Sequence, residues 1–182
     1  GNDPTDGHSH LDAGTFVFES DGVRWAKDLG MGAYTTAYFE TGDTEENPGQ
    51  ITGSRWKFIS TRAEAHNTLS INPTTTQGDQ YRAEAPMEVE TSNNGVIATV
   101  DLSDVLFGVS SAKRGFFFTD SRQSLVIRDE LTTNASDDIY WTMILPAGVT
   151  YTQSGNTITL TAENGKTLTF EYAVTGNTAN DV

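Results

Sequence analysis

The feature that most constrains this chain is its long succession of short β-type segments, with almost no helical periodicity. Runs of β-branched and aromatic residues alternate with Gly, Asn and Asp along the whole sequence, and this pattern is typical of strands joined by turns. The one stretch that could wind, residues 60–65, is too short to form a helical layer. The sequence therefore predicts an antiparallel all-β fold.

The expected strands outnumber those of an ordinary immunoglobulin-like domain. Turns are predicted at Asp21-Gly22, Asn93-Asn94-Gly95, Asp120-Ser121-Arg122 and Glu163-Asn164-Gly165, and a polar loop at residues 41–53. We expect a single domain over residues 1–182: a large antiparallel two-sheet β-sandwich, supersandwich-like, with little or no helix. The strands are expected near residues 15–19, 23–28, 33–39, 55–60, 67–72, 80–90, 95–102, 113–119, 124–131, 138–145, 148–152, 156–162 and 166–173.

The charge balance limits the classes of partner. The chain has 25 Asp and Glu against 11 Lys and Arg, a formal net charge of -14, so nucleic acid, which is held by Lys and Arg contacts to phosphate, is not an expected partner. No apolar run approaches the ~20 residues of a membrane helix, so membrane insertion is not expected. The absence of cysteine excludes disulfides and thiolate metal sites. The chain opens on a polar, turn-rich segment without the pattern of a signal peptide, and we expect it to be a fragment of a longer protein.

Three histidines carry the most specific chemistry. His8 and His10 form H-S-H, and His66 opens H-N-T. In extended backbone, residues two apart place their side chains on one side, about 6–7 Å from each other. Neutral imidazole is the commonest protein ligand for zinc, and a carboxylate often joins it. The pattern is compatible with a metal site, although H-x-H alone is a weak signal.

Two carboxylates, Asp12 and Asp28, are candidates for the third ligand. If Asp21-Gly22 is a two-residue hairpin turn, Ser20 pairs with Val23, and counting back places Asp28 opposite Thr15. Asp28 then lies at the strand end from which the H-S-H loop emerges. This geometry favours Asp28, and Asp12 stays open as an alternative.

Two blocks of the sequence resemble those of heparinase II/III-like polysaccharide lyases. Residues 7–30, G-H-S-H-L-D-A-G-T-F-V-F-E-S-D-G-V-R-W-A-K-D-L-G, are similar to that family's H-x-H-x-D-x-G-x-F block. Residues 62–72, R-A-E-A-H-N-T-L-S-I-N, are similar to its R-x-x-x-H-N-T block. The resemblance implies the C-terminal β-sandwich of an enzyme that cleaves uronic-acid polysaccharides, such as glycosaminoglycans or alginate, by β-elimination.

The resemblance also implies roles for particular residues. His8 corresponds to a catalytic histidine, and His10, Asp28 and His66 correspond to the ligands of a structural ion, zinc or another divalent cation. Residues 1–13 are then a site-forming loop. In the family an upstream helical toroid supplies a catalytic Tyr and much of the grip on the acidic polysaccharide, and this chain does not contain it. We therefore expect a periplasmic or secreted bacterial protein whose isolated domain has no lyase activity.

Further side chains near the motifs are candidates for supporting roles. Arg62, Asn67 and Tyr34 are candidates for substrate contact or for orienting a ligand, with a packing role expected for Asn67 and for the strand aromatics Tyr34 and Tyr38. The other nearby cations are expected to be ordinary exposed side chains: Arg24, Lys27, Arg55 and Lys57.

Two other functions remain open from the sequence. The domain could be a non-catalytic module that binds glycan or supports a partner domain. It could also be a self-contained metal hydrolase or cupin-like enzyme, because three protein ligands leave a fourth position for water.

Overall fold

The computed structural model describes residues 7–32, 34–74, 77–119, 123–135 and 137–176. In this part of the chain the regular elements are antiparallel strands and short 3-10 turns of three or four residues. The expected all-β fold is confirmed. The predicted connection at residues 120–122 lies outside the described residues, as do the first six residues of the predicted site-forming loop.

The strands pair into four sheets. A hairpin joins β1 (Phe18–Ser20) to β2 (Val23–Ala26), and a second pair joins β3 (Leu69–Ile71) to β8 (Ile139–Trp141). A four-stranded sheet has the order β4-β5-β6-β7, and a three-stranded sheet has the order β11-β10-β9. The bounds of these strands are β4 Met87–Ser92, β5 Gly95–Asp101, β6 Val109–Thr119, β7 Leu125–Thr133, β9 Thr150–Ser154, β10 Thr157–Thr161 and β11 Thr167–Glu171.

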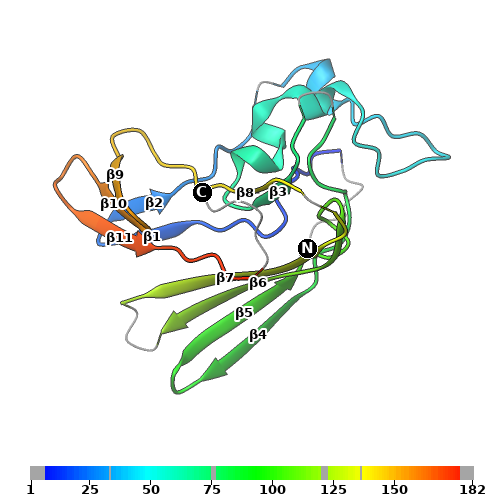
Figure 1. Ribbon diagram of the computed structural model, residues 1–182. Coiled ribbons are helices and arrows are strands. Elements are labelled where there is room, and N and C mark those ends of the chain that lie inside the picture. The colour runs from blue at the N-terminus through cyan, green and yellow to red at the C-terminus, as the bar shows by residue number, and fades with distance from the viewer. Residues whose placement is uncertain (1–6, 33, 75–76, 120–122, 136, 177–182) are drawn as a thin grey trace.

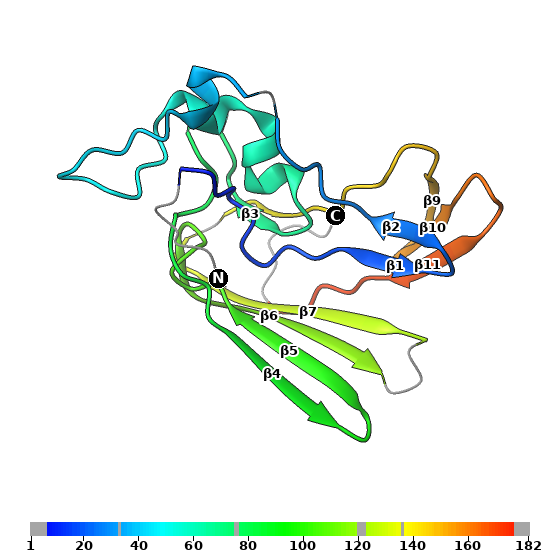
Figure 2. The same cartoon turned by 180° about the vertical axis from the view of Figure 1, so that it is seen from behind.

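The sheets form a sandwich-like arrangement of two layers (Figure 1). The four-stranded sheet is one layer, and the β1–β2 hairpin, the β3–β8 pair and the β9–β11 sheet lie opposite it. The view from behind shows the 3-10 turns beyond this second layer, on the side that faces away from the four-stranded sheet (Figure 2). The segments that follow the H-S-H motif and precede H-N-T therefore meet on the outside of the sandwich.

Two apolar clusters form the core, one between the two layers and one within the second layer. The first joins β3 to β5 and β6 across the sandwich, and its buried members are Leu69, Ile71, Val100, Leu102, Leu106 and Ala112. The second joins the β1–β2 hairpin to the three-stranded sheet through Val23, Trp25, Leu160 and Ala162. Burial of each large side chain of this kind contributes roughly 1.5–3 kcal/mol relative to its exposure. The second cluster holds β2, which ends two residues before Asp28.

Two predicted strands, 33–39 and 55–60, are wrong. In their place the chain forms 3-10 turns: η1 (Thr36–Phe39), η2 (Ser54–Lys57) and η3 (Ile59–Thr61). In a strand, consecutive side chains face opposite sides of the sheet, yet Arg55 and Trp56 are neighbours and both are fully buried. A tight turn accommodates this, and Phe58 N–H donates to the Arg55 carbonyl at 3.1 Å.

Residues 80–90 are also mostly not a strand, because β4 begins only at Met87. A further 3-10 turn, η4 (Ala63–Ala65), falls within the stretch whose winding potential the sequence indicated, and it ends directly before His66.

The β1–β2 hairpin has the predicted turn but not the predicted register. Asp21 and Gly22 adopt φ values of 52° and 74°, as a two-residue type I′ turn requires, and Ser20 pairs with Val23. An irregularity between Phe18 and Glu19 then pairs Phe18 with Ala26 instead of Trp25. The expected pairing of Thr15 with Asp28 is displaced by one residue, because one extra residue is accommodated on the second strand.

Among the described residues, none of the helical segments has the length and apolar character to cross a membrane.

Candidate functional site

The H-S-H loop is anchored at the residue between its two histidines. Arg55 donates from Nη2 to the Ser9 carbonyl at 2.7 Å and from Nε to the same oxygen at 3.2 Å. Two residues further on, Leu11 N–H donates to the Thr61 carbonyl at 2.9 Å, and its side chain packs in a buried cluster with Trp56. The backbone that carries His8 and His10 is therefore fixed against η2 and η3.

Arg55 itself is a correction, because we expected an exposed cation and the side chain is fully buried. Its Nη1 donates to the Tyr38 carbonyl at 2.5 Å, and its guanidinium lies 4.7 Å from the centre of the Tyr38 ring. A buried guanidinium needs such carbonyl acceptors and aromatic faces to offset its lost hydration. No local pattern indicates this role, since S-R-W-K-F has the pattern of an amphipathic strand.

His66 and Asp28 lie in contact although they are 38 residues apart in the sequence. Nδ1 of His66 is 2.7 Å from Oδ2 of Asp28, whose other oxygen accepts the Gly30 N–H at 2.7 Å. His66 is fully buried, whereas the Asp28 side chain keeps 36% of its surface exposed. Burial of Asp28 acts to raise its pKa, but the Gly30 N–H and the His66 ring outweigh it and hold the pKa below its usual range. Asp28 is therefore a carboxylate at neutral pH.

His10 lies beside this pair. Its ring centre is 5.4 Å from that of His66, and its Nε2 is 2.9 Å from the Tyr38 hydroxyl, which also accepts the Gly32 N–H. Burial, followed by the neighbouring His66 and Arg55, lowers the pKa of His10 to about 4. His10 is then a neutral imidazole at pH 7, which is the form that binds metal ions.

Asp12, the alternative ligand, belongs to the same electrostatic group. Burial raises its pKa, His66 opposes this increase and the Asp28 carboxylate adds to it. Asp28 is favoured over Asp12 as a partner of His66, because Oδ2 of Asp28 lies 2.7 Å from Nδ1 of His66.

The side chains of His10, Asp28 and His66 are of the types that bind zinc. Zinc lies about 2 Å from a ligating imidazole nitrogen, so two rings on one tetrahedral ion have centres roughly 5 Å apart, close to the 5.4 Å between His10 and His66. Nε2 of His66 is buried without a hydrogen-bond partner among the described residues, and such an atom is destabilising unless something occupies the adjacent space. Within the described ranges, no group of three or more His, Asp or Glu side chains is arranged so that it could hold a metal ion.

His8 lies outside this group, on the exposed side of the loop. Its ring packs edge-on against Phe39, with ring centres 5.3 Å apart. Tyr34 packs against the same Phe39 at 4.7 Å and leaves 64% of its surface exposed. An exposed imidazole and an exposed phenol thus share one aromatic support next to the His10 site.

Tyr38 has a different position from Tyr34, and neither residue is a strand aromatic. Tyr38 is buried, with 2% exposure, and its hydroxyl contacts His10. The sequence singled out Tyr38 only as a neighbour of Asp28. Its hydrogen bond to the first motif was not predictable from spacing, because 28 residues separate it from His10.

Asn67 is fully buried and joins three segments of backbone. Its Nδ2 donates to the carbonyls of Phe16 and Lys27 at 2.6 and 3.1 Å, and its Oδ1 accepts the Ile144 N–H at 2.6 Å. These contacts fix His66 relative to the chain that leads to Asp28.

Arg62 is also buried, and its donors point to backbone carbonyls. Nη1 donates to the carbonyls of Trp56 and Gln77 at 2.9 and 2.5 Å, and Nη2 donates to that of Thr74. Nε pairs with Glu64 at 2.9 Å. In the structure Arg62 thus organises the segment that follows β3.

Comparison with known proteins gives one family. The family model described as Heparinase II/III-like, C-terminal, matches residues 1–181 of the chain. Comparison with curated proteins and with solved structures returns no match.

Proposed function

Because the chain belongs to the Heparinase II/III-like, C-terminal family, we propose that it is the β-sandwich part of a polysaccharide lyase. In this proposal the domain contributes a metal-braced loop with the catalytic residue His8 to a site that cleaves uronic-acid glycans by β-elimination. The observation that carries it is the meeting of His66 with Asp28 at 2.7 Å, beside His10, under the loop that presents His8.

His10, Asp28 and His66 would hold the ion, with Asp12 as a second carboxylate nearby. The ion would supply a fixed positive centre that braces the loop, and its role is structural. The support for this role is the meeting of His66 Nδ1 with the Asp28 carboxylate beside the neutral ring of His10. The anchoring of the Ser9 carbonyl by Arg55 acts in the same direction, since both restrict the loop that carries His8.

β-Elimination removes the proton from C5 of a uronic acid and expels the oxygen at C4. It requires a base at C5, an acid at the leaving oxygen, and neutralisation of the sugar carboxylate. The exposed ring of His8 can accept the C5 proton or donate a hydrogen bond to the carboxylate, because a neutral imidazole has one accepting and one donating nitrogen. The exposed ring of Tyr34, on the same Phe39 support, is placed to contact the sugar.

The partner in this function is an acidic polysaccharide, bound together with an upstream helical toroid. The domain alone carries a formal charge of -14, which repels an anionic chain at long range. The basic groove that such a substrate needs would therefore come from the toroid. A periplasmic or extracellular location follows from the same proposal, because polymeric glycans are met outside the cytoplasm.

The test is the formation of unsaturated uronate, followed by its ultraviolet absorbance, with the protein that carries the toroid ahead of this domain. We expect His8→Ala to abolish the product on glycosaminoglycan or alginate, while thermal unfolding and metal content remain those of the parent. Lys57→Ala, which removes an exposed cation from η2, is the matched control and should retain activity.

Three results would contradict the proposal in different ways. Full activity of His8→Ala would exclude His8 as the catalytic residue. Cleavage without an unsaturated end would indicate a metal hydrolase. Glycan binding with no cleavage by the unmodified protein would indicate a non-catalytic module.

A further inference from the structure

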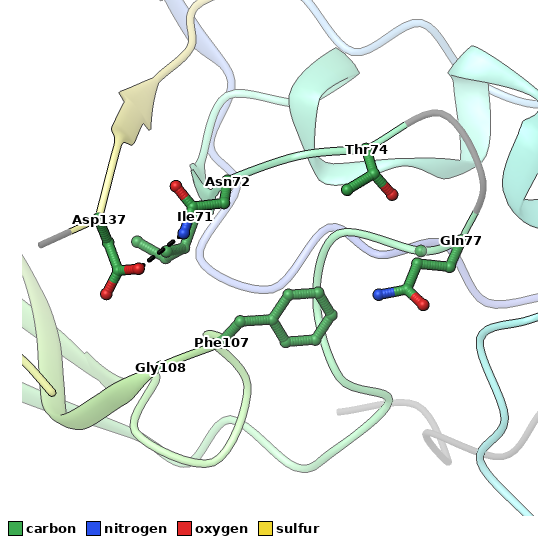
Figure 3. A pocket seen from close by; sticks show the side chains of 8 residues that line it. Ile71, Asn72, Thr74, Gln77, Phe107, Gly108 and Asp137 are labelled. Carbon is green, nitrogen blue, oxygen red and sulfur yellow. Dashed lines mark hydrogen bonds between the residues drawn. The ribbon is translucent and has the colours of Figure 1, made fainter. Parts of the chain in front are cut away.

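A polar cavity lies at the C-terminal end of β3, whereas His66 precedes the N-terminal end of this strand. It has a volume of about 230 Å³ and its lining residues are Ile71, Asn72, Thr74, Gln77, Gly78, Phe107, Gly108 and Asp137. In Figure 3 the Phe107 ring lies in the middle of this group, with Gln77 and Thr74 on one side and Asp137 and Asn72 on the other. At about 30 Å³ for each liquid water, this volume corresponds to roughly eight waters. The cavity therefore has room for one sugar ring and not for a glycan chain.

The Asp137 carboxylate gives the cavity an unused acceptor. Asn72 Nδ2 donates to Oδ1 at 2.7 Å, while Oδ2 is buried without a hydrogen-bond partner among the described residues. A buried carboxylate oxygen without a donor is destabilising by roughly 1–3 kcal/mol or more. A ligand hydroxyl that donated to Oδ2 would remove this penalty.

The carboxylate is held in place before any ligand binds. Asn72 adopts φ of 42°, and its Oδ1 accepts the Asp138 N–H at 2.9 Å while its own N–H donates to the Asp138 carbonyl at 3.0 Å. A Cβ on Gly108 would lie 3.3 Å from Asp137 Oδ2, so glycine at this position keeps space beside the oxygen. Preorganisation of this kind reduces the entropy that a ligand loses on binding.

The opposite wall is held by a residue of the histidine block. Arg62 donates to the carbonyls of Gln77 and Thr74, and Gly78 N–H donates to the Ile51 carbonyl at 2.8 Å. With its backbone fixed, the Gln77 amide faces the Phe107 ring (Figure 3). The cavity therefore presents amide and hydroxyl groups, one carboxylate and one aromatic ring.

This combination matches a neutral sugar. Phe107 packs edge-on against Tyr81, with ring centres 4.4 Å apart, and Tyr81 leaves 52% of its surface exposed. The apolar face of a pyranose packs on such rings, while its hydroxyls exchange hydrogen bonds with carboxylate and amide groups. None of the described lining residues is Lys or Arg, so an acidic sugar would meet the Asp137 carboxylate without a counter-charge.

We propose that this cavity binds one neutral sugar unit, such as an uncharged residue or branch of a glycan. The site does not depend on the histidines, on a bound ion or on lyase activity.

The 182-residue chain is tested by titration with methyl galactoside, methyl glucoside, methyl xyloside and N-acetylglucosamine, with glucuronate in parallel, in amide NMR spectra. We expect at least one neutral sugar to shift the signals of Gly78, Gly108 and the Gln77 side-chain amide with millimolar affinity, and glucuronate to leave them unchanged. Asp137→Asn should weaken this binding about tenfold or more, because it removes a charged acceptor. Glu88→Gln, at an exposed position of β4, also removes one negative charge; it is the matched control and should bind like the parent chain.

Phe107→Leu provides a second variant that keeps an apolar side chain and removes the ring, and it should also weaken binding about tenfold. The proposal is overturned if no neutral sugar shifts these signals, if glucuronate binds as well as the neutral sugars, or if both variants retain full affinity in folded protein. Calcium-induced shifts of the same signals, without sugar binding, would identify a cation site instead. If the protein bound a neutral sugar here but had no lyase activity, that result would contradict the proposed function and leave this proposal standing.

Discussion

At the scale of single residues, buried polar side chains define both candidate sites. Arg55, Arg62 and Asn67 are almost fully buried, and each donates to backbone carbonyls of distant segments. Buried donors of this kind are stable only with such acceptors, so each contact fixes a loop. His66 differs from them, because its Nε2 is buried without a partner in the described part of the chain. The other ring nitrogen of His66, Nδ1, contacts Asp28 beside His10, and we propose that a cation binds there.

Removal of a ligand should therefore abolish metal binding. His66→Ala and His10→Ala are expected to yield protein without stoichiometric zinc by elemental analysis, because each removes one imidazole of the pair. At a free zinc concentration of roughly 100 Kd, the ion should stabilise the parent chain by about 3 kcal/mol. Chelation should thus lower the thermal midpoint of the parent and leave that of both variants unchanged.

His8→Ala is the control for this prediction. It lies in the same loop, and it should retain zinc and the response to chelation, because its ring packs on Phe39 away from the ligand group. Equal zinc content in all four proteins would show that His10 and His66 do not hold the ion.

A second prediction at this scale concerns pH. Burial acts against ionisation of Asp43, but Arg82, Thr41 and the Gln50 N–H outweigh it and hold its pKa below the usual range. A lowered pKa in the folded state adds stability above the unfolded value of about 3.9, and this stability is lost as pH falls through the folded pKa. Asp43→Asn should therefore lower the free energy of unfolding by about 1 kcal/mol at pH 7.

The difference between Asp43→Asn and the parent should shrink in urea unfolding below about pH 4. Glu45→Gln, an exposed substitution in the same loop, should show no such penalty at pH 7. A penalty for Asp43→Asn that is constant across this range would contradict the assigned contacts.

At the scale of elements, the sequence predicted the strands that alternate regularly and missed the turns that bury consecutive residues. The hairpins at Asn93-Asn94 and Asn164-Gly165 follow from local turn chemistry, and the structure has them. Residues 33–39 and 55–60 have strand-like composition, but they form 3-10 turns because Tyr38, Arg55 and Trp56 are buried by contacts with distant segments. Tertiary contacts of this kind override local propensity.

For the candidate site, spacing indicated which residue types belong together but not how they meet. Counting along the hairpin placed Asp28 near the H-S-H loop, although the register is displaced by one residue at Phe18. The contact of Asp28 with His66 depends on Asn67, which holds both chains through distant carbonyls. No local pattern encodes such a long-range contact, and the roles of Arg55 and Tyr38 were missed for the same reason.

Asn67 should therefore be the most sensitive position between the elements. Asn67→Ala removes its donors to the Phe16 and Lys27 carbonyls and its acceptor for the Ile144 N–H. With about 1 kcal/mol for each buried hydrogen bond, urea unfolding should show a loss of roughly 3 kcal/mol. Zinc content should also fall, because His66 and Asp28 lose their common support. Asn94→Ala, in an exposed turn, is the matched control, and an Asn67→Ala protein as stable as this control would exclude the bridging role.

At the scale of the whole molecule, the two proposed glycan sites differ in their place in the layers and in the charge of the sugar that they would bind. The histidine site lies on the outer side of the second layer, among the 3-10 turns, and in the proposed function it acts on an anionic substrate. The cavity around Phe107 is proposed to bind a neutral sugar. A chain with a formal charge of -14 favours the second contact by itself, since long-range repulsion acts only on the charged polymer.

The isolated chain should accordingly produce no unsaturated uronate from glycosaminoglycan or alginate, even with zinc bound and the fold intact. His8 is exposed, and elimination needs an acid, a base and a neutralised carboxylate held around one sugar ring. Raising the salt concentration to about 0.15 M shortens the range of the repulsion to about 8 Å and should still give no product. Charge repulsion weakens only the binding of the polysaccharide. In the proposed function the remaining catalytic groups come from the toroid, so salt does not replace them. If salt alone restored activity, and His8→Ala abolished it again, the complete catalytic site would have to lie within these 182 residues.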